Sequence, residues 1–257
     1  GWLDGVNVAW YRRTLEIDDE LRACPRLWIR FAAVATVATV FIDGKEVGWH
    51  SGDWLPFEIE ITDAVAGKSS VELMVRVEKM VAPPQVMVDG VPVQNGHLTK
   101  GFHDLLSCHH GGIWDRVELR GTGAVSFIPG GVTAVTDGAG GRVSISCEMT
   151  GKGAEGTVRA VLKDRRGRAV AKGEANVSAG TRLVELTLGV QNPEMWWPES
   201  PTLYTLEVEA LSDGRVSDRA AVGLGFRTVT ISPQRGGQML LNGRPILLRG
   251  LLDWGHE

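Results

Sequence analysis

The stretch VATVFIDGKEV, residues 37–47, indicates the fold class of this chain. Apolar runs flank Asp43-Gly44, and a two-residue turn of the primed type needs a positive φ at both central positions, which Asp and Gly tolerate best. The stretch therefore predicts a β-hairpin that pairs Val37–Ile42 with Lys45–Val47. Asn242-Gly243, also set between apolar runs, predicts a second hairpin near the end of the chain.

Sequence patterns typical of β-strands recur through the rest of the chain. Apolar and polar residues alternate with a period of two, which is typical of strands with one face on a core and the other in water. Of the remaining sequence, Ile61–Lys68 fits a helix of one or two turns. We therefore expect an all-β chain, and the alternating runs are Phe57–Ile61, Val71–Glu78, Val143–Met149 and Tyr204–Ala210.

The chain divides near Gly121–Val125. Residues 1–124 have long loops between strands and suit a jelly-roll β-sandwich. Residues 125–232, with turns about every eight to twelve residues, suit an immunoglobulin-like β-sandwich. Within residues 233–257, Ile246–Leu252 is nearly continuous apolar sequence, the pattern of a strand buried on both faces of a parallel sheet. We expect three segments with these bounds.

Composition excludes several classes of partner. The formal net charge is -4, and the sequence lacks the basic patch that nucleic-acid binding needs. No run reaches the ~18 apolar residues of a membrane span. Cys24, Cys108 and Cys147 lack C-x-x-C spacing and allow at most one disulfide, so they leave the redox compartment open.

A set of phrases, in a fixed order, resembles glycoside hydrolase family 2. Three of them resemble that family's N-terminal domain: AWYRRTLEI (9–17), LWIRFAAVATVATVFIDGKEVGWHSGDWLPFEIEIT (27–62) and GGIWDRVEL (111–119). Two resemble its immunoglobulin-like second domain: WWPESPTLYTLEV (196–208) and GFRTVTI (225–231). The last, LNGRPILLRGLLDWGHE (241–257), resembles the beginning of its third domain, a (β/α)₈ barrel. The chain departs from the family pattern at Ala33, Asp43 and Asp53-Trp54, where the family has Gly, Asn and Gly-Tyr.

The resemblance implies the function of a longer enzyme. Family members resemble retaining glycosidases, in which two glutamates ~5 Å apart cleave the glycosidic bond. One of them lies in an Asn-Glu pair, and this chain contains no such dipeptide. We therefore expect a fragment, the non-catalytic N-terminal portion of a family 2 retaining exo-β-glycosidase such as a β-galactosidase, β-glucuronidase or β-mannosidase. It would support the barrel and shape the carbohydrate pocket, without a cofactor. A stand-alone carbohydrate-binding module and a structural spacer are the alternatives. The compartment stays open among bacterial cytoplasm, periplasm and secretion.

The resemblance also implies site residues. An Asp in the loop ahead of the G-I-W phrase contributes to sugar binding in the family, and Asp104 matches it, with His103, His109 and His110 in the same loop. The barrel would add residues at the C-terminal end of a strand that ends at Leu252. Carboxylates accept hydrogen bonds from sugar hydroxyls and an indole stacks on a ring face. The alternative is that Asp104 caps a turn and the histidines are solvated. The barrel candidates are Asp253, Trp254, His256 and Glu257.

Other clusters have simpler interpretations. His97–Gly112 holds four of the six histidines, but its spacing matches no zinc pattern, so we expect no metal. Trp196-Trp197 are packing anchors or a sugar platform. Trp10 and Trp28 lie in strand patterns and are expected in a core, whereas the glycine-flanked loop of Trp49 and Trp54 favours sugar contact. An exposed apolar tail at residues 240–257 predicts self-association.

Overall fold

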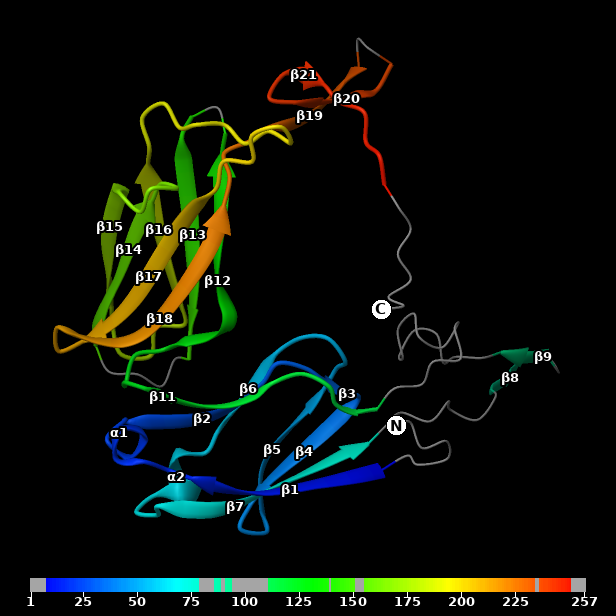
Figure 1. Ribbon diagram of the computed structural model, residues 1–257, viewed down its shortest axis with the longest axis vertical. Coiled ribbons are helices and arrows are strands. Elements are labelled where there is room, and N and C mark those ends of the chain that lie inside the picture. The colour runs from blue at the N-terminus through cyan, green and yellow to red at the C-terminus, as the bar shows by residue number, and fades with distance from the viewer. Residues whose placement is uncertain are drawn as a thin grey trace. The chain divides into compact units, whose positions relative to one another are not determined.

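The computed structural model describes residues 8–78, 86–88, 91–93, 111–138, 140–150, 155–233 and 236–250 (Figure 1). The chain forms two compact units, residues 1–123 and residues 124–257. Most of the described residues are in strands, as predicted, and the two helices are single turns: α1 (Asp19–Arg22) and α2 (Thr62–Val65). Neither is long enough to cross a membrane.

The first unit is a β-sandwich (Figure 1). One sheet has four strands in the order β1 (Val8–Glu16), β7 (Ser70–Glu78), β4 (Val37–Ile42) and β5 (Lys45–Ser51). A second has three strands in the order β11 (Val117–Thr122), β2 (Arg26–Phe31) and β6 (Phe57–Glu60). Two pairs complete the unit: β10 (Gly112–Ile113) with β3 (Val34–Ala35), and β8 (Val86–Val88) with β9 (Val91–Val93).

Alternation of side chains places the core of this unit between its sheets. Val40 on β4 pairs with Val75 on β7, and both are almost fully buried. From the other sheet, Phe31 stacks on Phe57 with ring centroids 4.9 Å apart. Burial of such side chains stabilises the unit by about 1.5–3 kcal/mol each relative to leaving them exposed.

The hairpin predicted from Asp43-Gly44 is confirmed. Asp43 has φ 48° and Gly44 has φ 79°, the backbone of the primed turn that joins β4 to β5. The Asp43 carboxylate accepts hydrogen bonds from Lys68 Nζ (2.8 Å) and from the backbone N–H of Glu72 (2.8 Å). These bonds lower the pKa of Asp43. The turn is therefore held by side-chain chemistry as well as by backbone preference.

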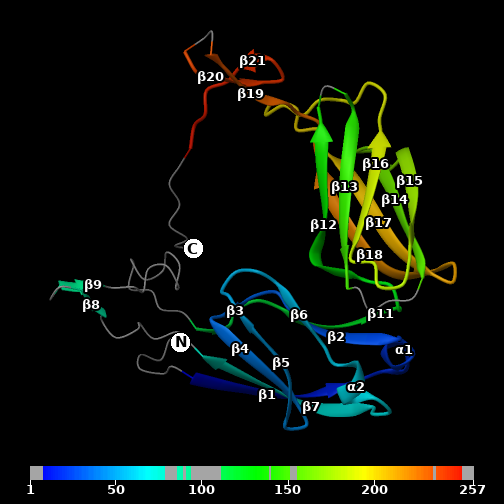
Figure 2. The ribbon, with the colours of Figure 1, turned by 180° about the vertical axis from the view of Figure 1, so that it is seen from behind.

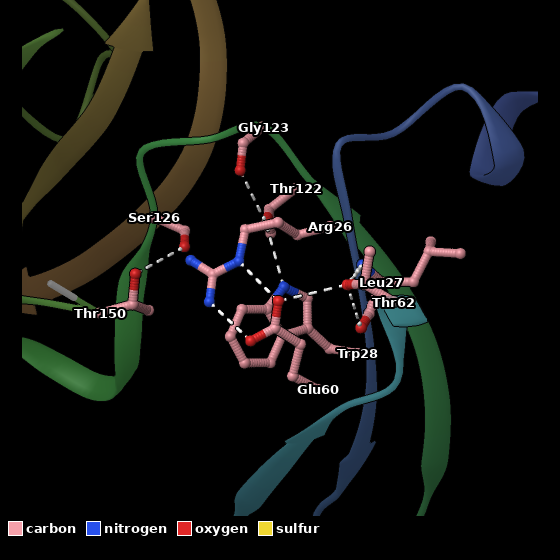
Figure 3. A network of polar contacts seen from close by, with 9 residues as sticks. All are labelled: Arg26, Leu27, Trp28, Glu60, Thr62, Thr122, Gly123, Ser126 and Thr150. Carbon is pink, nitrogen blue, oxygen red and sulfur yellow. Dashed lines mark hydrogen bonds and ion pairs between the residues drawn. The ribbon is translucent and has the colours of Figure 1, made fainter. Parts of the chain in front are cut away.

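A polar network lies on the three-stranded sheet (Figure 3). Arg26 donates to both carboxylate oxygens of Glu60, at 3.0 Å and 2.9 Å, and its guanidinium lies 4.4 Å from the ring centroid of Trp28. The Trp28 indole N–H donates to Thr122 Oγ1 at 3.0 Å. Trp28 is 9% exposed, so the expectation that it is a core residue is confirmed.

The second unit contains another sandwich (Figure 2). A three-stranded sheet has the order β12 (Phe127–Asp137), β13 (Arg142–Met149) and β16 (Leu183–Gly189). The facing sheet has the order β15 (Ala169–Val177), β14 (Gly156–Lys163), β17 (Tyr204–Ser212) and β18 (Arg215–Leu224).

One cluster of buried side chains fills this sandwich. Tyr204 and Phe226 meet edge to face with centroids 5.1 Å apart, and the Tyr204 hydroxyl accepts from the Glu194 backbone N–H at 2.9 Å. Cys147 is fully buried in the same core, and burial raises the pKa of its thiol to about 11. Cys24 and Cys147 are both free thiols.

A small sheet of β19 (Val229–Ser232), β20 (Gln238–Leu241) and β21 (Arg244–Pro245) follows. Its Asn242-Gly243 turn has φ 48° and 80°, which confirms the second predicted hairpin.

The strand predicted over Ile246–Leu252 is not formed in its described part, Ile246–Gly250; Leu251 and Leu252 lie outside the described residues. Strand β21 ends at Pro245, and Leu247 and Leu248 are 79% and 69% exposed. The Ile246 N–H still donates to Met239 O at 3.1 Å. A strand buried on both faces needs neighbouring strands, and none of the described strands pairs with residues 247–250.

Candidate functional site

The sugar-binding residues predicted from the sequence fall outside the described residues. The structure therefore does not test their placement, and their roles stay predictions. They are Asp104, His103, His109, His110, Asp253, Trp254, His256 and Glu257.

The segment that follows the predicted Asp104 loop is anchored at Gly112. Strand β10 pairs Gly112 with Ala35 and Ile113 with Val34. Gly112 has φ 121°, and a Cβ at this position would lie 2.5 Å from the Tyr11 hydroxyl. Both facts require glycine, since other residues are strained at this φ and a side chain would collide with Tyr11. The chain two residues after His110 is thus fixed to the sandwich.

Two tryptophans form an aromatic corner next to this anchor. Trp54, in the loop after β5, and Trp114, after β10, meet edge to face with centroids 5.0 Å apart and an interplanar angle of 76°. The Trp114 indole N–H donates to the Asp53 carbonyl at 3.0 Å, which fixes its orientation. The rings are 52% and 45% exposed. We call this pair the Trp54–Trp114 corner; it offers apolar faces on which a sugar ring can stack.

Buried polar atoms without partners lie at the end of β5 and in the loop after it. His50 Nε2 and Asp53 Oδ1 are buried, with no hydrogen-bond partner among the described residues. His50 stacks on Phe57 with centroids 4.1 Å apart, and burial lowers its pKa, so the imidazole is neutral at pH 7. Each unsatisfied buried group costs about 1–3 kcal/mol. Sequence reasoning missed His50, because VGWHSG shows no alternation that would place its side chain inward.

Two other tryptophans differ from the sequence interpretation. Trp10 was expected in a core and is 55% exposed, so that expectation is wrong. Its side chain lies on the face of β1 opposite to the core, next to Phe41 at 5.6 Å between centroids. Trp49 is 66% exposed and lies within strand β5 rather than in a loop.

Trp196 and Trp197 make contacts typical of packing anchors. Both are half-buried. The Arg227 guanidinium lies 5.2 Å from the Trp196 ring centroid, and the Arg244 guanidinium lies 4.7 Å from that of Trp197. Cation–π contacts of this kind contribute about 0.5–1 kcal/mol at exposed sites. Because arginines occupy these rings, the contacts favour packing over a sugar platform.

Two cavities are lined by neither Trp54 nor Trp114. In the first unit, a groove of about 290 Å³ lies between the edge strands β1 and β11 and is lined mainly by apolar side chains such as Leu15, Phe31 and Leu119. In the second, a polar hollow of about 660 Å³ lies beside the β14–β15 hairpin, where Arg168 pairs with Asp164 at 2.7 Å. Among the described residues, no three His, Cys, Asp or Glu side chains come close enough to hold a metal ion. Neither cavity groups residues for catalysis.

The chain matches known families over both of its units. The galactose-binding domain-like model of glycosyl hydrolase 2 matches residues 2–111, and the model of glycosyl hydrolases family 2 matches residues 131–227. It is similar to a β-glucuronidase of Paenibacillus borealis (29% identity over 96% of this chain and 40% of the relative). It is also similar to a β-galactosidase of Thermoanaerobacter pseudethanolicus (26% identity over 95% of this chain and 31% of the relative).

A solved structure shows the same fold. The crystal structure of a Bacteroides uniformis β-glucuronidase superimposes with a TM-score of 0.73 at 22% identity, covering 95% of this chain and 29% of that one. The β-sandwiches and the two model matches define the chain as carrying the N-terminal domains found in β-glycosidases. The chain belongs to glycosyl hydrolase family 2. It spans about a third of the length of the curated relatives it matches.

Proposed function

We propose that this chain is the non-catalytic N-terminal portion of a retaining exo-β-glycosidase. In this role its domains, bounded at residues 1–124, 125–232 and 233–257, support a (β/α)₈ barrel and shape the rim of its carbohydrate pocket. Family membership supports the class of enzyme, and relatives named β-galactosidase and β-glucuronidase support a β-linked glycoside as the substrate. Hydrolysis itself is assigned to residues that this chain does not supply.

The observation that carries the proposal is the Trp54–Trp114 corner. It joins the loop after β5 to the segment that directly follows the predicted Asp104 loop, and Gly112 fixes that segment on β3. In the proposed pocket the indoles pack against the apolar face of the sugar or its aglycone. The Asp104 carboxylate accepts hydrogen bonds from sugar hydroxyls.

Trp114 is rigidly attached to the first unit, as a residue that contacts a bound sugar must be. A group that binds the transition state must be held within about 0.5 Å of its productive position. Trp114 meets this need because its indole N–H is bound to Asp53 O and its backbone N–H to Ala33 O at 3.4 Å. From the barrel, Asp253, Trp254, His256 and Glu257 are proposed to complete the pocket.

The test is kinetic and uses the complete enzyme that contains this chain. We expect Asp104→Asn and Trp54→Ala each to lower kcat/KM for aryl β-glycosides at least tenfold, about 1.4 kcal/mol of transition-state binding. The neighbouring Leu55 is 73% exposed and makes a matched control, since Leu55→Ala removes apolar surface from the same loop. Unchanged kinetics in both variants, or losses matched by a lower Tm, would refute the proposal.

A further inference from the structure

The solvent-facing side of the four-stranded sheet carries a row of residues that the proposed pocket does not use. Strand register places Trp10 opposite Arg76, Arg76 opposite Thr39, and Thr39 opposite Trp49. Directly opposed residues in antiparallel strands point to the same face of a sheet. We call these four residues, one from each strand, the tryptophan row.

The indoles at the two ends of the row are open to solvent. Trp10 is 55% and Trp49 66% exposed, and Trp10 is supported from the side by Phe41. Three steps between neighbouring strands separate β1 from β5 in this sheet. At about 4.8 Å a step, the two tryptophans stand on strands about 14 Å apart. A ligand with several sugar rings can contact both tryptophans across this strand spacing.

Charged side chains share the face with the row. Arg12 pairs with Glu72, and Arg76 pairs with Glu78. The cores of protein–protein interfaces are depleted of charge, so a face with this many ions is poorly suited to bury against another protein. The combination of spaced aromatic rings with donors and acceptors suits a ligand that presents apolar ring faces and polar hydroxyl edges.

We propose that the tryptophan row binds an extended β-linked oligosaccharide. Trp10 and Trp49 stack on two of its sugar rings, while the Thr39 hydroxyl and the Arg76 guanidinium hydrogen bond to hydroxyls between them. Diequatorial β-1,4-linkages give an extended ribbon that lies along a sheet, whereas α-1,4-linked chains coil away from it. The row thus holds a glycan on the outside of the sandwich, and this assignment does not rest on the proposed pocket.

Isothermal titration calorimetry on the 257-residue chain tests the proposal, with the β-1,4-linked cellohexaose, mannohexaose, chitohexaose and xylohexaose as probes. We expect at least one of these β-linked hexasaccharides to bind, its disaccharide to bind at least tenfold more weakly, and maltohexaose, which is α-linked, not to bind. Trp10→Ala and Trp49→Ala should each weaken binding at least tenfold. Trp49→Tyr, which keeps a ring for stacking, should recover most of the loss.

Control variants distinguish the tryptophan row from the rest of the surface. Val135 is 70% exposed on β12, so Val135→Ala tests a loss of exposed apolar surface outside the sheet and should leave binding unchanged. Absence of binding by all four β-linked probes overturns the proposal. So does loss of binding in Trp54→Ala but not in the row variants, because the corner would then be the site. Sedimentation velocity adds a third outcome: if Trp10→Ala and Trp49→Ala dissociate an oligomer without changing glycan affinity, the face is an interface between copies, and the proposal fails.

Discussion

Replacement of Gly112 by alanine should destabilise the first unit by about 2–3 kcal/mol. Two contributions follow from the structure. The φ of 121° is unfavourable for alanine, and strain of this kind costs about 1–3 kcal/mol. The added Cβ would also lie 2.5 Å from the Tyr11 hydroxyl. Tyr11 is 39% exposed and can move, so the contact adds less than a clash with backbone would.

Urea unfolding followed by tryptophan fluorescence measures this loss. Tyr11→Phe in the Gly112→Ala background should recover about 1 kcal/mol, because it removes the contacted oxygen but leaves the φ strain. Gly223→Ala is the control, since its Cβ would meet no atom within 4 Å and its φ is not positive; its stability should not fall. A Gly112→Ala chain within about 0.5 kcal/mol of the wild type would show that neither strain nor contact operates at this anchor.

Three further predictions concern charge and surface. Burial lowers the pKa of His50, so the unfolded chain binds a proton at this residue more readily than the folded chain. The free energy of unfolding should therefore fall as the pH decreases below the unfolded pKa of about 6.5 and on through the folded pKa. Urea titrations in which His50→Phe shows the same dependence of stability on pH as the wild type would contradict this. Arg26→Met should cost about 2 kcal/mol, less than a fully buried pair because Glu60 is 27% exposed, whereas Arg159→Met, from an exposed pair, should leave the melting temperature nearly unchanged. Truncation after Pro245 should reduce self-association, because it removes exposed Leu247 and Leu248; light scattering that finds equal masses would argue against a role for the tail.

The parts of the fold that sequence predicted are those set by local chemistry. Asp43-Gly44 and Asn242-Gly243 specify their turns because few other residue pairs accept two positive φ values. The buried face of strand β7 could be predicted because apolar and polar residues alternate along its length. The buried face of strand β1 could not be predicted, since AWYRRTLE lacks alternation, and Trp10 was assigned to the wrong face for that reason.

Features that depend on distant partners could not be read in the same way. Leu247–Gly250 continues the apolar composition of a strand but pairs with no strand among the described residues, so composition alone was insufficient. Trp54 was singled out from its glycine-flanked loop, yet its pairing with Trp114 joins positions sixty residues apart and needed the fold. For Asp104 and the barrel residues, only family resemblance supplied a role.

The buried thiol of Cys147 can be used to measure opening motions of the second unit. Only a thiolate reacts with alkylating reagents, and a pKa of about 11 together with full burial protects this sulfur in the closed sandwich. The rate at which Cys147 is labelled therefore depends on how often the second unit opens, as the rate of amide hydrogen exchange does. Cys24, partly exposed in the first unit, does not need such opening to react and supplies a reference rate. Resolved by peptide mass, the Cys147 rate relative to the Cys24 rate would report how often the second sandwich opens.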